Sequence, residues 1–136
     1  MSHPHDPRRR QLGLAAVSSL ALGAFGTAQA QSAAWPTAKP IRMIVNFPAG
    51  GSPDLVARAV STTVSQALGQ QIVVDNRGGA GGIIGTDATA KAAPDGYTLM
   101  LTANNFIITP ALYRSVPYKV PGDFTLIGMV GRGDNL

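Results

Sequence analysis

The residues best suited to chemistry lie in a glycine turn, residues 47–54, between an apolar run and a helix-like run. Glycines let a backbone approach a ligand closely, and the free N–H groups of a helix's first turn carry partial positive charge. Ser52 suits the N-cap and Pro53 the first helical position. The stretch predicts a carboxylate or phosphate cradle formed by Gly50, Gly51 and Ser52, with an ordinary strand-to-helix turn as the alternative.

Two side chains beside this turn have separate predicted roles. Phe47 borders the turn and is expected to form a pocket wall. Asp54 is negatively charged, so we expect it to stabilise the helix start rather than to contact an anion.

Two further loops contain groups that can bind a polar ligand. The loop at 76–82 is rich in glycine, and the junction at 102–105 offers neutral hydroxyl and amide groups that orient ligands without charge. Capping of the next helix is the alternative for at least one asparagine there. The predicted ligand contacts of these loops are Gly79, Ala80, Gly81, Thr102, Asn104 and Asn105.

The second loop does not fit a nucleotide-binding motif. Gly79-Ala80-Gly81 gives G-x-G, but Ile84 occupies the third glycine position, and no acid follows about 20 residues on. The phosphate-binding motif G-x-x-x-x-G-K-[ST] is missing from the sequence. Arg77 could pair with a ligand acid or with a structural partner such as Asp75, and the sequence favours neither.

The amino-terminal segment has the features of a secretory signal peptide over residues 1–30. Arg8 to Arg10 precede an apolar stretch broken by glycine and serine, and Ala28-Gln29-Ala30 is a typical cleavage site. A membrane anchor and a twin-arginine signal are the alternatives. The remaining chain carries eight basic and six acidic residues, which gives no indication of nucleic-acid binding.

The composition of residues 31–136 excludes several kinds of catalysis. This part has no His, Cys or Glu, so it cannot form a Ser-His-Asp triad, a Cys/His zinc site or a disulfide. We therefore predict ligand binding, with no catalytic residues, metal or cofactor.

Strand-like and helix-like segments alternate along the chain. Strands are predicted at 41–47, 71–75, 97–102 and 124–130, and helices at 53–68, 83–92 and near 110–113, with Gly69 ending the first helix. This alternation indicates an α/β fold with a mainly parallel sheet, whose ligands bind beyond the carboxyl ends of the strands. The first helix is expected to bury Leu55, Val56, Ala59, Val60, Thr63, Val64, Ala67 and Leu68.

Several ordered motifs together resemble the Bug (TctC) family of periplasmic receptors for tripartite tricarboxylate transporters. They lie at residues 39–45, 47–54, 74–82, 92–99, 110–113 and 123–125. The resemblance implies a two-lobed type II periplasmic-binding-protein (Venus flytrap) fold that binds a small organic acid and delivers it to membrane permease subunits. It also implies carboxylate contacts at Gly50, Gly51 and Ser52, some of them through water.

The resemblance also implies that residues 31–136 are the amino-terminal part of the first lobe, so that the lobe is incomplete. Ligand burial between two lobes would then need chain beyond Leu136. A non-functional fragment of such a receptor and a small nucleotide-using α/β enzyme are the two alternatives.

Overall fold

A computed structural model describes residues 34–132, and the predicted signal peptide lies outside this range. The elements are β1 (Ile41–Val45), α2 (Ser52–Leu68), β2 (Ile72–Asn76), the short 3-10 helix η1 (Ala80–Gly82), α3 (Ile83–Ala90), β3 (Thr98–Leu101) and α4 (Asn105–Leu112). Of the helices in this range, none is long and apolar enough to cross a membrane.

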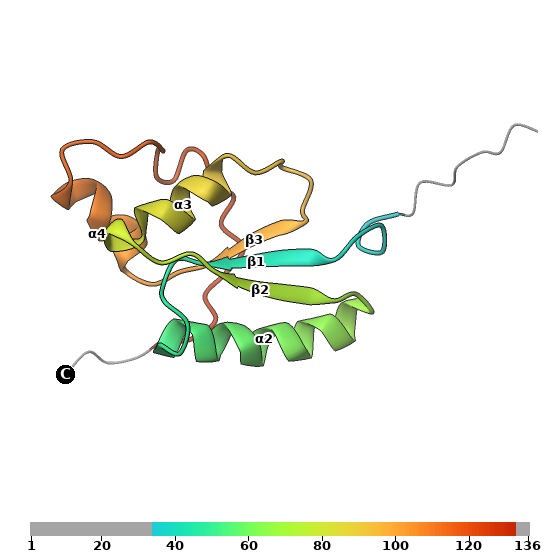
Figure 1. The fold of residues 1–136 in the computed structure, drawn as a ribbon. Helices are drawn as coiled ribbons and strands as arrows, with labels where there is room; N and C mark the ends of the chain where they lie inside the picture. The colour runs from blue at the N-terminus through green and yellow to red at the C-terminus, as the bar shows by residue number, and fades with distance from the viewer. Residues whose placement is uncertain (1–33, 133–136) are drawn as a thin grey trace, which may run out of the picture. The chain divides into compact units, whose positions relative to one another are not determined.

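The three strands form one parallel sheet in the order β2-β1-β3. The register pairs Ile41 with Ile72 and Met43 with Leu99. Helix α2 covers one face of the sheet and α3 lies on the other (Figure 1). The predicted parallel α/β fold is confirmed, and the loops that follow the three strands share one edge of the sheet because the strands run in the same direction.

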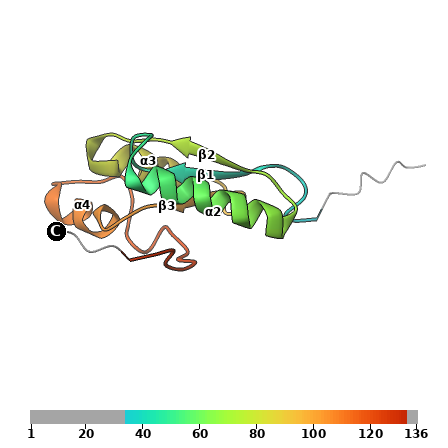
Figure 2. The ribbon, with the colours of Figure 1, turned by 90° about the horizontal axis from the view of Figure 1, so that it is seen from below.

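The core lies between the sheet and α2, which crosses the strands in the view of Figure 2. The central strand β1 is nearly fully buried, since both of its edges are paired and both of its faces are covered. Its side chains pack with residues of α2, β2 and the turn before β3. The buried cluster consists of Ile41, Met43, Val45, Ala57, Ile72 and Tyr97.

The buried face of α2 differs from the predicted one. Asp54, Ala57 and Ser61 are its buried residues, and Val60, Val64 and Leu68 pack partly against the core. Leu55 and Val56, which were expected inside, are 63% and 41% exposed, and Ala59, Thr63 and Ala67 are also exposed. The small residues Ala57 and Ser61 are thus the most buried part of this face, and of the larger side chains Leu55 and Val56 are exposed.

Both ends of α2 are informative. Gly69 ends the helix in the left-handed conformation (φ 62°, ψ 23°), as predicted. The predicted N-cap is wrong, because Gly51 occupies that position and Ser52 is already helical. The helix start therefore lacks a side-chain cap and depends on other contacts.

The predicted fourth strand at 124–130 is wrong. This run has no strand or helix, and Ile127 and Met129 are 84% and 82% exposed. An apolar run becomes a strand only when another strand pairs with it, and none does so within residues 34–132. Helix α4 is longer than predicted and includes Pro110, whose missing N–H falls in the last turn.

Candidate functional site

A hollow of about 230 Å³ lies at the edge of the sheet where the strands end. We call the segment between β1 and α2 loop 1 (46–51), the segment after β2 loop 2 (77–82) and the segment after β3 loop 3 (102–104). Loops 1 and 2 and the first residue of α4 form the hollow, and none of its lining side chains is charged. The lining residues are Asn46, Phe47, Pro48, Gly79, Gly81, Gly82 and Asn105.

Loop 1 is held at both ends by side chains. The Gly50 N–H donates to Asp54 Oδ2 at 2.9 Å, and Asn76 Nδ2 donates to the Phe47 carbonyl at 3.4 Å. The hydrogen bond from Gly50 and the one from Arg58 Nε, at 3.1 Å, lower the pKa of Asp54. Asp54 therefore stabilises the turn as predicted, and the Gly50 amide is already engaged within the chain.

Loop 2 is shaped by backbone conformations that favour glycine. Gly79, Ala80, Gly81 and Gly82 all have positive φ, from 49° at Ala80 to 122° at Gly79. A Cβ at Gly78 would lie 2.8 Å from the backbone nitrogen of Pro48. Because Gly78 has no side chain, loops 1 and 2 can pack in direct contact, and this contact forms one wall of the hollow.

Helix α4 fixes loop 2 from the other side. Asn105 Nδ2 and Thr109 Oγ1 donate to the Gly81 carbonyl at 3.2 and 2.9 Å. These residues are four apart, so they lie on one face of the helix. Thr102 donates to Asn105 Oδ1 at 3.2 Å and orients that amide. Asn105 is thus a bridge between loops, and Asn104 is the N-cap residue of α4 without a side-chain cap bond.

Asn46 lies beneath the junction of loops 1 and 2 and is 2% exposed. The Thr86 hydroxyl donates to the Gly82 carbonyl at 2.8 Å, so it accepts from Asn46 Nδ2 at 3.1 Å. Asn46 Oδ1 has no hydrogen-bond partner among the described residues. This buried network ties the end of β1 to loop 2 through α3.

The structure brings together only part of the predicted site. Phe47, Gly79, Gly81 and Asn105 line the hollow. The other predicted contacts do not line it, and they are Gly50, Gly51, Ser52, Ala80, Thr102 and Asn104.

Sequence reasoning missed Asn46 and Pro48 as lining residues, whereas Gly82 lies within the predicted glycine-rich loop although it was not singled out as a contact. Asn46 could have been found, because it is the first polar residue after an apolar strand run and therefore stands at the carboxyl end of that strand. For Arg77 the structural alternative holds, since its Nε lies 3.0 Å from Asp75 Oδ2. Arg42 is the stronger partner of that carboxylate and chiefly lowers the pKa of Asp75.

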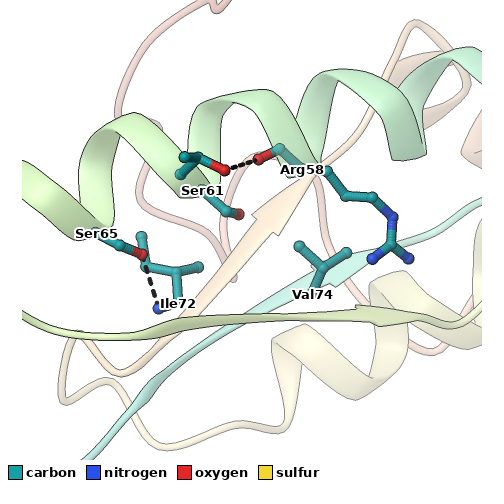
Figure 3. Close-up of a pocket in the computed structure, with 6 residues that line it drawn as sticks. Arg58, Ser61, Ser65, Ile72 and Val74 are labelled. Carbon is teal, nitrogen blue, oxygen red and sulfur yellow. Dashed lines mark hydrogen bonds between the residues drawn. The ribbon is translucent and has the colours of Figure 1, made fainter.

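A larger hollow of about 320 Å³ lies between α2 and β2, away from the loop edge (Figure 3). Its hydroxyl groups are occupied, since Ser65 accepts from the Ile72 N–H at 3.0 Å and Thr62 donates to the Arg58 carbonyl at 3.0 Å. We assign the site to the smaller hollow, because loops 1 and 2 and the start of α4 meet there at the carboxyl ends of parallel strands.

The sequence match that decides the family spans residues 56–134, where the chain fits the family described as "TctC: Tripartite tricarboxylate transporter family receptor". The chain belongs to the TctC family. This is a family of receptors and not of enzymes, so the alternative of a nucleotide-using enzyme is wrong.

Two relatives of this TctC chain are much longer than the chain itself. Protein BugT of Bordetella pertussis (strain Tohama I) is 48% identical over 87% of this chain and 37% of its own length. A UPF0065 protein of Pseudomonas sp. (strain P51), from the tcbD-tcbE intergenic region, is 42% identical over 86% of this chain and 34% of its own length. The TctC chain thus spans little more than a third of these relatives.

Two solved structures share the fold of the TctC chain. "Structure of a periplasmic transporter" aligns with a TM-score of 0.60 and 48% identity over 62% of this chain and 29% of that protein. "R. palustris Rpa4515 with adipate" aligns with a TM-score of 0.54 and 32% identity over 63% of this chain and 29% of that protein. The described lobe is therefore part of a periplasmic-binding-protein fold.

Proposed function

We propose that the protein is an extracytoplasmic receptor that binds a small organic carboxylate for a tripartite tricarboxylate-type transporter. The observation that carries this proposal is the uncharged hollow at which loops 1 and 2 meet the start of α4. Backbone amides and neutral side chains there can bind a carboxylate without a free cation. The adipate in the solved relative, a dicarboxylate, supports the same ligand class.

The remaining parts of the proposal follow the family. Residues 1–30 are a signal peptide that directs the chain to the periplasm, and residues 31–136 are the amino-terminal part of the first lobe. Membrane permease subunits of the transporter are the partners. Loop 1, loop 2 and Asn105 supply the ligand contacts, with the amides of Gly51 and Ser52 as donors because the Gly50 amide is engaged by Asp54.

The ligand class is tested by calorimetric titration of the protein as expressed with dicarboxylates of four to six carbons, adipate among them. The uncharged diamides of the same lengths serve as controls. We expect at least one acid to bind and its diamide to fail. Equal binding of acid and diamide, or no binding of any acid, would contradict the proposal.

The loop 1 assignment is tested with Gly51→Ala. A Cβ at this position meets the Pro48 carbonyl oxygen at 3.6 Å and Pro53 Cδ at 3.7 Å, which are ordinary contacts, and its φ is −78°. The variant should therefore keep stability within about 0.5 kcal/mol while its methyl group crowds the ligand. Gly128→Ala is the matched control, because no atom lies within 4 Å of its Cβ. Unchanged affinity in Gly51→Ala would remove loop 1 from the site.

A further inference from the structure

Asp54 places a carboxylate two residues after Ser52, one of the two residues whose amides are proposed to bind the ligand. It lies in the first turn of α2, is 3% exposed and accepts the Gly50 N–H. Its position at the helix start and the contacts that lower its pKa keep it negatively charged at neutral pH. A carboxylate bound by the Gly51 and Ser52 amides would therefore lie near a fixed negative charge.

This charge would oppose binding if it were not compensated. Two unit charges of the same sign repel strongly at short range in a protein, much more than in water. A receptor for an anion therefore needs a counter-ion for Asp54. The counter-ion must also stay paired with Asp54 when the ligand binds.

Arg58 meets this requirement, one helical turn along α2. Its Nε donates to Asp54 Oδ2, and its Nη2 lies 3.1 Å from Asp54 Oδ1. The same Nη2 donates to Asn76 Oδ1 at 3.3 Å, at the end of β2. Figure 3 shows the side chain extending from α2 toward β2, beyond Val74. Contacts on two elements hold the guanidinium in place.

Asn76 completes a chain of polar contacts around loop 1. Because its Oδ1 accepts from Arg58, its Nδ2 faces the Phe47 carbonyl and donates to it. The chain runs from the Gly50 amide through Asp54, Arg58 and Asn76 to the Phe47 carbonyl. Both ends of loop 1 are thereby fixed by one network that contains one positive and one negative charge.

We propose that Arg58 is a positioning residue of the carboxylate site: it neutralises Asp54 and, through Asn76, holds loop 1 in the conformation that receives the ligand. This rests on the proposed function. Arg58 does not contact the ligand. Its effect on affinity comes from the charge of Asp54.

The test compares Arg58→Gln, Asp54→Asn and the double variant in the protein as expressed, with adipate and the other acids of the titration as probes. Arg58→Gln should weaken binding about tenfold, because Asp54 is left unpaired. Asp54→Asn should keep or increase the affinity, since the negative charge is gone and the amide oxygen can still accept from Gly50. The double variant should return to within about threefold of the unchanged protein.

Lys91→Gln is the matched control. Lys91 forms the same i,i+4 pair with Asp87 at 2.7 Å, on α3. It should leave the affinity unchanged. Loss of affinity in Arg58→Gln and Asp54→Asn alike, with no recovery in the double variant, would overturn the proposed charge compensation and indicate a merely structural pair.

A second measurement needs no ligand and separates this inference from the proposed function. Hydrogen exchange at the Gly50 amide should accelerate in Arg58→Gln and in Asn76→Ala, because each breaks the network that holds loop 1. If no acid binds the unchanged protein, the receptor proposal fails while faster exchange still supports the positioning role. Unchanged exchange at Gly50 in both variants would overturn that role.

Discussion

Loops 1 and 2 meet at the same edge of the sheet, and both are rich in glycine, but different forces hold them. Loop 1 is fixed by side chains, with Asp54 bonded to the Gly50 amide and Asn76 to the Phe47 carbonyl. Loop 2 depends more on its own backbone, which runs through four consecutive residues with positive φ and packs directly on its neighbours, and on neutral side chains of α4 that donate to the Gly81 carbonyl.

The difference shows what each glycine does. A Cβ at Gly51 would make only ordinary contacts, whereas one at Gly82 would lie 2.8 Å from Asn46 Nδ2. A methyl group therefore fits at Gly51 of loop 1 and not at Gly82 of loop 2. Because Gly79, Gly81 and Gly82 line the hollow, the closely packed loop 2 forms one of its walls.

The largest expected effect is in loop 2, where Gly82→Ala should lower the free energy of unfolding by roughly 2–4 kcal/mol. Gly82 has φ 92°, and the new methyl group would collide with the buried Asn46 amide. Urea denaturation of the variant measures the change.

Gly131→Ala is the control for this comparison. It adds the same methyl group at a position where no atom lies within 4 Å and φ is not positive. Its free energy of unfolding should stay within about 0.5 kcal/mol. If Gly82→Ala behaved like the control, loop 2 would not be held by close packing.

The sequence predicted the parallel sheet and the shared loop edge because those depend on local patterns. Near-continuous apolar runs such as 41–45, interrupted only by Arg42, and the glycine at the end of α2 are sufficient to place strands and helix ends. The helix face was predicted in part: Val60, Val64 and Leu68 pack against the core, but Ala57 and Ser61 are the residues that are buried most, which hydrophobicity alone does not predict for a serine. The strand at 124–130 was wrong because a strand needs a partner that local patterns do not reveal.

Part of the site was also predicted from local sequence patterns. Glycine turns after strands mark the edge of an α/β sheet where ligands bind, and Phe47, Gly79, Gly81 and Asn105 do line the hollow there; their contact with a ligand stays a prediction. The sequence did not show that Asp54 occupies the Gly50 amide or that Asn46 lies beneath the loops. Those facts depend on long-range packing of α2 and α3 against β1.

Loops 1 and 2 should also differ, by a smaller amount, in how their local stability depends on pH. The pKa of Asp54 is lowered in the folded chain, so between the two pKa values the unfolded state binds more protons and stability rises with pH. The stability that ionised Asp54 contributes is fully present above the unfolded-state pKa of about 3.9, and it is lost as the pH falls through the lowered pKa of the folded state. Residues 78–82 of loop 2 contain no titratable side chain.

Hydrogen exchange, corrected for the intrinsic pH dependence, measures this difference. As the pH falls below about 3.9 and through the lowered pKa of Asp54, protection at the Gly50 amide should fall before protection at the Gly82 amide, which donates to the Gly79 carbonyl at 2.9 Å. Asp54→Asn should remove the pH dependence at Gly50. Parallel loss at both amides would show that the two loops open together.

The smallest expected effect concerns Ala80, the one non-glycine residue among the positive-φ positions of the described chain. A left-handed conformation costs an alanine roughly 1–2 kcal/mol, and a glycine costs about 0.5–1 kcal/mol in chain entropy. Ala80→Gly should therefore raise the free energy of unfolding by about 0.5 kcal/mol, measured by urea denaturation. Ala49→Gly in loop 1, where φ is not positive, should lower it instead. If Ala80→Gly raises the free energy of unfolding and Ala49→Gly lowers it, the backbone conformation governs the stability of loop 2. Changes of the same sign in both variants would contradict this.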